Sequence, residues 1–372
     1  MAQGKVSVRN LNLGQGPVTE IERYFLFIGL AANNVGELIP LNTQSDLDTE
    51  LGAAVSDLKT QVKTARLNGG DRWAALALPI AAAADWEEAL DAAMQHGVSV
   101  EAVILCSPVT AGTELTALHA KAEAINNQYG RRLFIMAASK GIDAASQDWN
   151  AYLAEQKAIT LNILAPRALV VPQLHGNDLG VLAGRLAIDA VSVADSPMRV
   201  ATGPVLGLGE TPVDKDGVPL PSAILAELDK ARFSVPQTYP DYPGVYWGDA
   251  NMLDAPGSDF QVVEYLRVAD KAARRVRILL IQRVGDRRLN NTPNSMAANK
   301  SALMRPLRQM AKSVQFAGQQ FPGDIEPPKD DDIVLVWMSK TRVEAYLKLR
   351  PYNCPKDLTA NIALDLSNGD EE

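Results

Sequence analysis

Short apolar runs alternate with longer amphipathic stretches through the first half of the chain. The apolar runs have no polar face, which predicts strands that are buried on both sides; they cover residues 24–29, 73–78, 100–106, 133–138 and 168–171. The stretches between them predict helices over residues 45–51, 56–67, 85–95, 113–128, 145–159 and 178–191. Strands separated by single helices imply a parallel sheet with helical crossovers.

The last third of the chain predicts two long helices followed by strands. Apolar side chains recur every three or four positions between residues 259 and 284, which gives a helix one buried face; they are Val262, Leu266, Ala269, Ala273, Val276, Leu280 and Val284. The opposite side of that helix carries a basic stripe, Arg267, Lys271, Arg274 and Arg275. A second helix is expected over residues 296–320, where Pro306 must kink or break it. Strands are expected at 333–338 and 342–349.

Both ends of the chain carry strand patterns that loops separate from the neighbouring cores. Apolar residues alternate with polar ones near the start, at Val6, Val8, Leu11 and Leu13, and near the end, at Leu358, Ala360, Ile362, Leu364 and Leu366. The backbone of a lone terminal strand needs a hydrogen-bonding partner. Each strand either pairs within its own subunit or adds to the sheet edge of a neighbouring copy.

These patterns predict an α/β fold, α+β overall, with a parallel α/β middle region, a C-terminal domain of mixed sheet and two long helices, and extended terminal arms. Segments rich in Gly and Pro at 202–222 and 236–244 indicate a connector and a domain boundary. We expect an N-terminal arm (1–20), a first core part (21–80), an α/β domain with the loop-rich connector (81–235), a C-terminal domain (236–357) and a C-terminal arm (358–372).

Charge is distributed unevenly along the chain, whose net charge is −8. Basic residues exceed acidic ones by ten between positions 267 and 323, so the remainder carries −18. This asymmetry suggests a face that meets an acidic partner, and a solvated helical face is the simpler alternative. The acidic remainder argues against a general nucleic-acid binder. A DNA-binding module built on the basic segment is an alternative that salt-sensitive binding would support.

Composition narrows the remaining function classes. The apolar runs are too short to span a bilayer, so we expect no membrane insertion. The start of the chain has no apolar signal-like core, and Cys106 and Cys354 lie far apart, which favours free thiols in a reducing compartment. The three histidines, at positions 96, 119 and 175, offer little for a metal site or a catalytic triad. We therefore expect no metal and no cofactor.

A parallel sheet can carry an enzyme site, because ligands bind at the carboxyl ends of its strands. The enzyme alternative is a small-molecule pocket at the ends of the strands 100–106, 133–138 and 168–171. The glycines at 203, 207 and 209 lack the spacing of a phosphate-binding loop. Cys106 ends a strand, but neither His119 nor another residue is an evident partner, so a buried thiol is favoured. We predict no catalytic residue.

The order of these elements resembles the contractile tail sheath proteins of bacteriophages and phage-tail-like particles. The similarity to the N-terminal half of that family covers residues 18–29 (VTEIERYFLFIG), 46–51 (DLDTEL) and 68–70 before a strand. In the C-terminal half, 244–253 (GVYWGDANML) leads into 260–288 and the helix pattern at 296–323. The strands 333–338 and 342–349 and the terminal segment 357–366 (DLTANIALDL) follow.

The resemblance implies an assembly function. In that family the sheet of the C-terminal domain receives strands from neighbours' terminal arms, which here would be carried by Val6, Val8, Leu11, Leu13, Leu358, Ile362, Leu364 and Leu366. A helix of the C-terminal domain commonly faces an inner tube, and here Arg267, Lys271, Arg274 and Arg275 would face it, with the α/β region outward.

The implied partners are other copies of this chain, in a helical homo-oligomer formed by strand exchange, the tail tube protein, and the baseplate and tail terminator proteins. No direct nucleic-acid contact is implied. The implied location is the virion tail, after assembly in the host cytoplasm. At 372 residues, the chain looks too large and too helical for the tube subunit itself.

Overall fold

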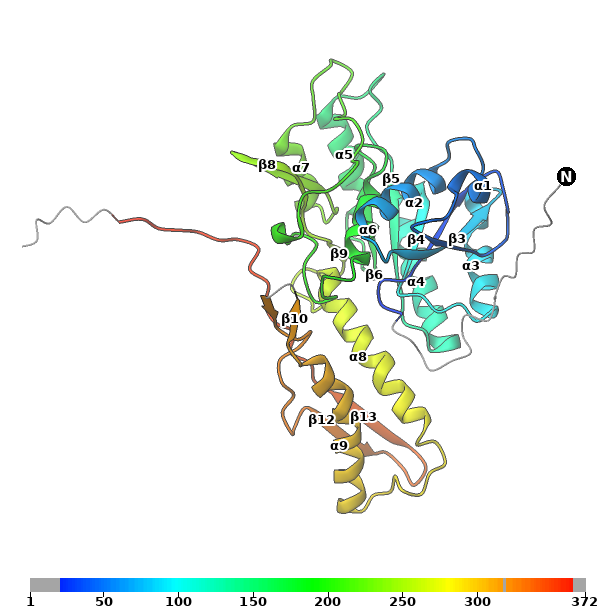
Figure 1. Ribbon diagram of the computed structural model, residues 1–372, viewed down its shortest axis with the longest axis vertical. Helices are drawn as coiled ribbons and strands as arrows, with labels where there is room; N and C mark the ends of the chain where they lie inside the picture. Colours follow the sequence, from blue (N-terminus) through cyan, green and yellow to red (C-terminus); the bar gives the residue numbers. More distant parts are fainter. Residues whose placement is uncertain (1–20, 317–318, 364–372) are drawn as a thin grey trace, which may run out of the picture.

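A seven-stranded, mostly parallel sheet forms the centre of the chain in the computed structural model, which describes residues 21–316 and 319–363 (Figure 1). Its strand order is β2–β3–β1–β4–β5–β6–β9. The parallel strands are β3 (Ala74–Ile80), β1 (Phe25–Leu30), β4 (Ala102–Val109), β5 (Phe134–Ser139) and β6 (Ala165–Pro172). The antiparallel edge strands are β2 (Ile39–Asn42) and β9 (Met252–Leu253).

Helices cover both faces of this sheet, which is why its parallel strands are mainly apolar. On β1, Phe25 and Phe27 join one core cluster, whereas Leu26 and Ile28 join the other. The first face is covered by α2 (Asp57–Asn68) and α6 (Asp178–Ala187). The second is covered by α3 (Trp86–Gln95), α4 (Gly112–Tyr129), α5 (Trp149–Thr160) and α7 (Ser222–Lys230). We call the sheet and these helices the body.

Local capping sets several of the helix boundaries. Asp46 caps α1 (Leu47–Leu51), Ser56 caps α2 and Asp148 caps α5, each with its side chain accepting a backbone N–H. Gly130 ends α4 in the left-handed region, at φ 64°. The short 3₁₀ helices are η1 (Ala83–Asp85) and η2 (Val200–Thr202), and β7 (Pro236–Tyr239) and β8 (Tyr242–Trp247) form a hairpin beside the body.

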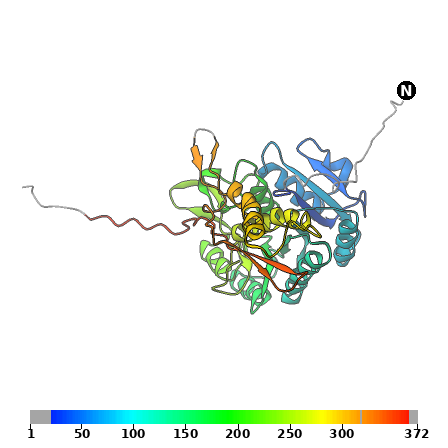
Figure 2. The same ribbon diagram turned by 90° about the horizontal axis from the view of Figure 1, so that it is seen from below.

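A C-terminal lobe, which we define as residues 268–350, projects from the body (Figures 1 and 2). It contains most of α8 (Val263–Ile281), then α9 (Pro293–Met310), the hairpin β10 (Val314–Phe316) and β11 (Gln319–Phe321), and the hairpin β12 (Ile333–Trp337) and β13 (Val343–Leu347). Its own apolar core joins Val268 and Val276 of α8 to Leu303 and Leu307 of α9 and to Ile333 of β12.

Several elements differ from the sequence-based expectation. Residues on both sides of position 80 contribute strands to one sheet, in which β1 lies between β3 and β4. The second long helix ends at Met310, not at residue 320, and the chain turns into β10 and β11. The buried face expected on the first long helix holds for Leu266 and Val276, but Val284 is 83% exposed because α8 ends at Ile281. The sequence pattern missed β2, which is only four residues long.

Buried ion pairs attach α8 to the body. The guanidinium of Arg267 donates to both carboxylate oxygens of Glu101 at 2.8 Å, and both residues are almost fully buried. Arg167 on β6 donates to both oxygens of Asp270, at 2.8 and 3.1 Å. A buried bidentate pair holds its two partners in one geometry, and removal of one partner leaves a buried charge uncompensated.

We expect Arg267→Met to lower the free energy of unfolding by about 3–5 kcal/mol, because Glu101 would keep a buried charge without its partner. Urea denaturation of the purified chain measures this. The matched control is Arg305→Met, at an exposed position of α9, which should change stability by no more than about 0.5 kcal/mol. The double variant Arg267→Met with Glu101→Leu should recover part of the loss. If Arg267→Met and Arg305→Met have the same free energy of unfolding, the Arg267–Glu101 pair is not needed to compensate the buried charge of Glu101.

Candidate assembly site

The described chain begins at a charged cluster against α8. Glu22 accepts a hydrogen bond from Nη2 of Arg274 at 2.7 Å, and both side chains are at most 10% exposed. The next backbone N–H, from Arg23, donates to Glu101 at 2.5 Å, and Glu101 is the residue that Arg267 holds. Burial alone would raise the pKa of Glu22, but the neighbouring Arg274 and Lys271 hold it below its usual value.

The predicted basic stripe on α8 is a set of internal ion pairs, not an exposed face. Arg267 and Lys271 are 2% and 8% exposed, and Arg274 is paired with Glu22. Lys271 lies 2.8 Å from Asp324, which follows β11. Arg275 is half-buried. The expectation of an exposed stripe is therefore wrong for these residues. The basic side of α8 faces carboxylates of Glu22, Glu101 and Asp324, which lie far from it in the sequence.

An exposed basic surface lies instead on α9. Arg305, Arg308 and Lys312, which follows the helix end, fall within about 60° of arc at helical spacing and are exposed. In the part of the chain that the structure describes, none of these three has an ion-pair partner. We call them the α9 basic stripe. The signal that the sequence offered was the absence of any acidic residue from 293–310.

The hairpin β12–β13 is an unfinished sheet. Its strands pair antiparallel, with Ile333 opposite Leu347, and within residues 21–316 and 319–363 neither strand has a second partner. Ile333 and Leu335 point into the lobe core, whereas Val334 and Tyr346 are 47% and 55% exposed. The outer edges of such a pair present free backbone N–H and C=O groups that another strand can bind.

The predicted arms lie at the limits of the described chain. Leu358 and Ile362 are 82% and 93% exposed, and residues 358–363 form no strand. This segment, red in Figure 1, runs away from the body. It leaves beside a cavity of about 890 Å³ that is lined partly by Tyr239, Tyr242 and Leu358. The remaining arm positions fall outside the described residues, namely Val6, Val8, Leu11, Leu13, Leu364 and Leu366.

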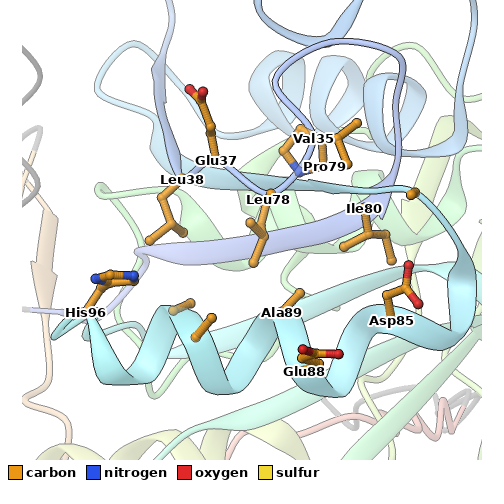
Figure 3. Close-up of a pocket in the computed structure, with 14 residues that line it drawn as sticks. Val35, Glu37, Leu38, Leu78, Pro79, Ile80, Asp85, Glu88, Ala89 and His96 are labelled. Carbon is orange, nitrogen blue, oxygen red and sulfur yellow. The ribbon is translucent and has the colours of Figure 1, made fainter.

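The elements of the enzyme alternative do not come together. Cys106 is buried in the core, where burial raises the pKa of its thiol, and His119 lies on α4 near Glu123 and Arg167. A cavity of about 660 Å³ opens elsewhere, between α3, the end of β3 and the loop before β2. Figure 3 shows its apolar centre, where Leu78 and Ile80 face Ala89. It contains no residue of β4, β5 or β6.

No cluster of three metal-ligating side chains occurs in the described ranges. Among the helices of these residues, none combines the length and the apolarity needed to cross a bilayer.

Comparison with known proteins identifies the family of this chain. Residues 3–251 match the family described as DUF2586, N-terminal domain, and residues 259–367 match DUF2586, C-terminal domain. A protein of Haemophilus phage HP1 (strain HP1c1), described as "Putative tail sheath protein", is 43% identical over 371 residues, which are 98% of this chain and 98% of that protein. The chain belongs to the tail sheath protein family. The resemblance inferred from the order of elements is thereby confirmed.

Solved structures share the fold of this sheath protein. The sheath complex of an extracellular contractile injection system in its contracted state superposes with a TM-score of 0.64 at 14% identity and covers 98% of both chains. A sheath tail protein from Desulfitobacterium hafniense gives a TM-score of 0.54 at 11% identity and covers 93% of this chain and 96% of its own. The family to which the chain belongs favours a structural role over an enzymatic one.

The lowered pKa of Glu22 predicts a pH-dependent contribution to the stability of this subunit. A carboxyl whose pKa falls on folding stabilises the folded state above its unfolded pKa, and this contribution is lost as the pH falls through the folded pKa. We expect Glu22→Gln to lose about 1–3 kcal/mol at pH 7 and progressively less below about pH 4.5. Urea midpoints measured from pH 7 to pH 3 test this. A difference from the unmodified chain that stays constant over this range would contradict it.

Proposed function

We propose that this sheath subunit polymerises helically around a tail tube and contracts to drive the tube through a cell envelope. The observation that carries the proposal is the unfinished hairpin β12–β13 together with an exposed apolar segment that leaves the body at Leu358. An open sheet edge and an unpaired strand pattern on one chain are complementary when two copies meet. Contacts between two different surfaces do not close on themselves, so they propagate into a helical sleeve.

Strand exchange would connect the copies. The apolar positions Leu358, Ile362, Leu364 and Leu366 would pair with a neighbour's hairpin, as would Val6, Val8, Leu11 and Leu13 from the other end. Main-chain hydrogen bonds between copies would form a mesh, and the loops that join the arm strands to the body would flex while the strands stay paired. Such a mesh allows the subunits to move without separating from one another.

The tube would face the α9 basic stripe. The segment 267–323 carries an excess of basic residues, and on α8 those charges are paired within the chain. Arg305, Arg308 and Lys312 are exposed and would meet an acidic tube surface. Exposed ion pairs contribute only about 0–1 kcal/mol each, so they can be broken one row at a time as the sleeve contracts.

The wider setting follows from the family. The subunit would be located in the virion tail after assembly in the host cytoplasm, and would contact the tail tube, baseplate and tail terminator proteins in addition to its own copies. The free energy for contraction would come from a larger area buried between subunits in the contracted state. Neither nucleotide nor nucleic acid takes part in this mechanism.

Deletion of residues 358–372 should give a soluble, folded subunit that no longer polymerises, because the C-terminal strand would be missing. The measurement is electron microscopy of the purified chain, in which the unmodified protein should form hollow striated tubes. The matched control is a deletion of 367–372, which leaves every apolar arm position in place and should assemble normally. Deletion of residues 1–15 should also block assembly. Tubes of normal length from either arm deletion would refute strand exchange.

Charge reversal of the α9 basic stripe, Arg305→Glu with Arg308→Glu and Lys312→Glu, should leave sleeves that form without a tube inside. The positions are exposed, so folding should be unaffected. Electron microscopy of particles assembled together with tube protein measures the fraction of filled sleeves. Reversal of the exposed Lys63 on α2 and Lys140, which follows β5, provides a control of the same kind on the body. Normal tube filling in the α9 variant would reject this surface.

A further inference from the structure

Both ends of the described chain are fixed to the same helix. On the N-terminal side, Glu22 pairs with Arg274 of α8 at 2.7 Å. On the C-terminal side, Nζ of Lys356 lies 2.7 Å from Glu264 in the first turn of α8 and donates to Asp249 at 2.6 Å. Glu264 and Arg274 are ten residues apart, which is about 15 Å along the helix axis.

The C-terminal attachment joins a buried carboxylate to a partly buried lysine, whose side chain is 27% exposed. Glu264 is 1% exposed, so its carboxylate requires a charged or hydrogen-bonding partner. Lys356 supplies that partner from a segment that has no helix or strand of its own between residues 352 and 363. Two positions earlier, the thiol of Cys354 contacts the carbonyl of Ala194 at 3.7 Å. Lys356 is therefore the charged contact that fixes the chain two residues before Leu358.

The N-terminal attachment has the same character. Glu22 is 5% exposed at its side chain, and the guanidinium of Arg23 donates to the carbonyls of Ile188 and Val191 at 3.0 and 2.7 Å. These contacts direct the chain from residue 21 into β1, while Arg274 on α8 holds the residue just before them. Each attachment thus combines an ion pair to α8, in which the glutamate is buried, with a contact to the loop that follows α6.

We propose that Lys356 and Arg274 are positioning residues for the two arms, and that α8 sets the distance between the points at which the arms leave the subunit. This inference rests on the proposed strand exchange. A tethered strand reaches its partner at an effective concentration that depends on where the tether begins and how freely it swings. Because the apolar arm pattern starts at Leu358, a fixed Lys356 restricts its swing directly.

The test is Lys356→Met in the full-length chain. The subunit should stay folded by circular dichroism, amide hydrogen exchange should accelerate in residues 351–358, and the critical concentration for polymerisation should rise about tenfold or more. Lys356→Arg keeps the cation and should restore most of the assembly. The matched control is Lys63→Met, at an exposed lysine on α2 of the body, which should assemble as the unmodified chain does.

Different outcomes separate this inference from the proposed function. If deletion of 358–372 blocks assembly but Lys356→Met polymerises at the normal concentration, the anchor is refuted and strand exchange survives. If the deletion itself has no effect, the proposed strand exchange fails and this inference fails with it. If Lys356→Met does not fold, Asp249→Asn takes its place, because it removes one of the two carboxylates that hold Lys356. The same rise in critical concentration is then expected, and a normal critical concentration refutes the anchor.

Discussion

The attachment of α8 to the body by buried arginine–carboxylate pairs is the constraint on which the rest of this structure depends. Arg267 with Glu101 and Arg167 with Asp270 place four charges where water is largely absent. Such pairs contribute little net stability compared with apolar side chains of the same shape, but they tolerate only one geometry. The lobe core and the hairpin β12–β13 are built outward from the helix that these pairs orient.

The sequence pattern predicted the body well, because there the apolar runs, the turn residues and the alternation of strands with helices all indicate the same fold. The strands 100–106 and 133–138 correspond to β4 and β5, and helix 113–128 corresponds to α4, because apolar runs bounded by Gly and Pro leave few alternatives. Ser56 and Gly130 stand where the helix caps require them. The sheath fold was predicted from the order of such elements, which survives when few individual residues are shared.

The charged side of α8 shows what a helical pattern cannot reveal. A row of arginines at helical spacing looks the same whether it faces solvent or carboxylates that lie far away in the sequence. Glu101 is 166 positions from Arg267, and Glu22 is 252 positions from Arg274. Only the tertiary arrangement brings them together, so the candidate site moved from α8 to α9. The strand pattern at 358–366 is a related case: residues 358–363 form no strand in the single chain, and the proposed pairing would need groups from another copy.

The length of α8 gives its attachment a mechanical consequence. From Asp270 to the end of α8 at Ile281 the helix extends about 16 Å, so a rotation of one degree at this attachment displaces the far end by about 0.3 Å. Any rotational freedom of the helix at its attachment to the body therefore produces a larger displacement at the outer end of the helix. A planar guanidinium held at two points resists such rotation better than a lysine, which swivels about a single charged atom. The use of arginine at positions 167 and 267 makes α8 a stiff lever and not a pliable hinge.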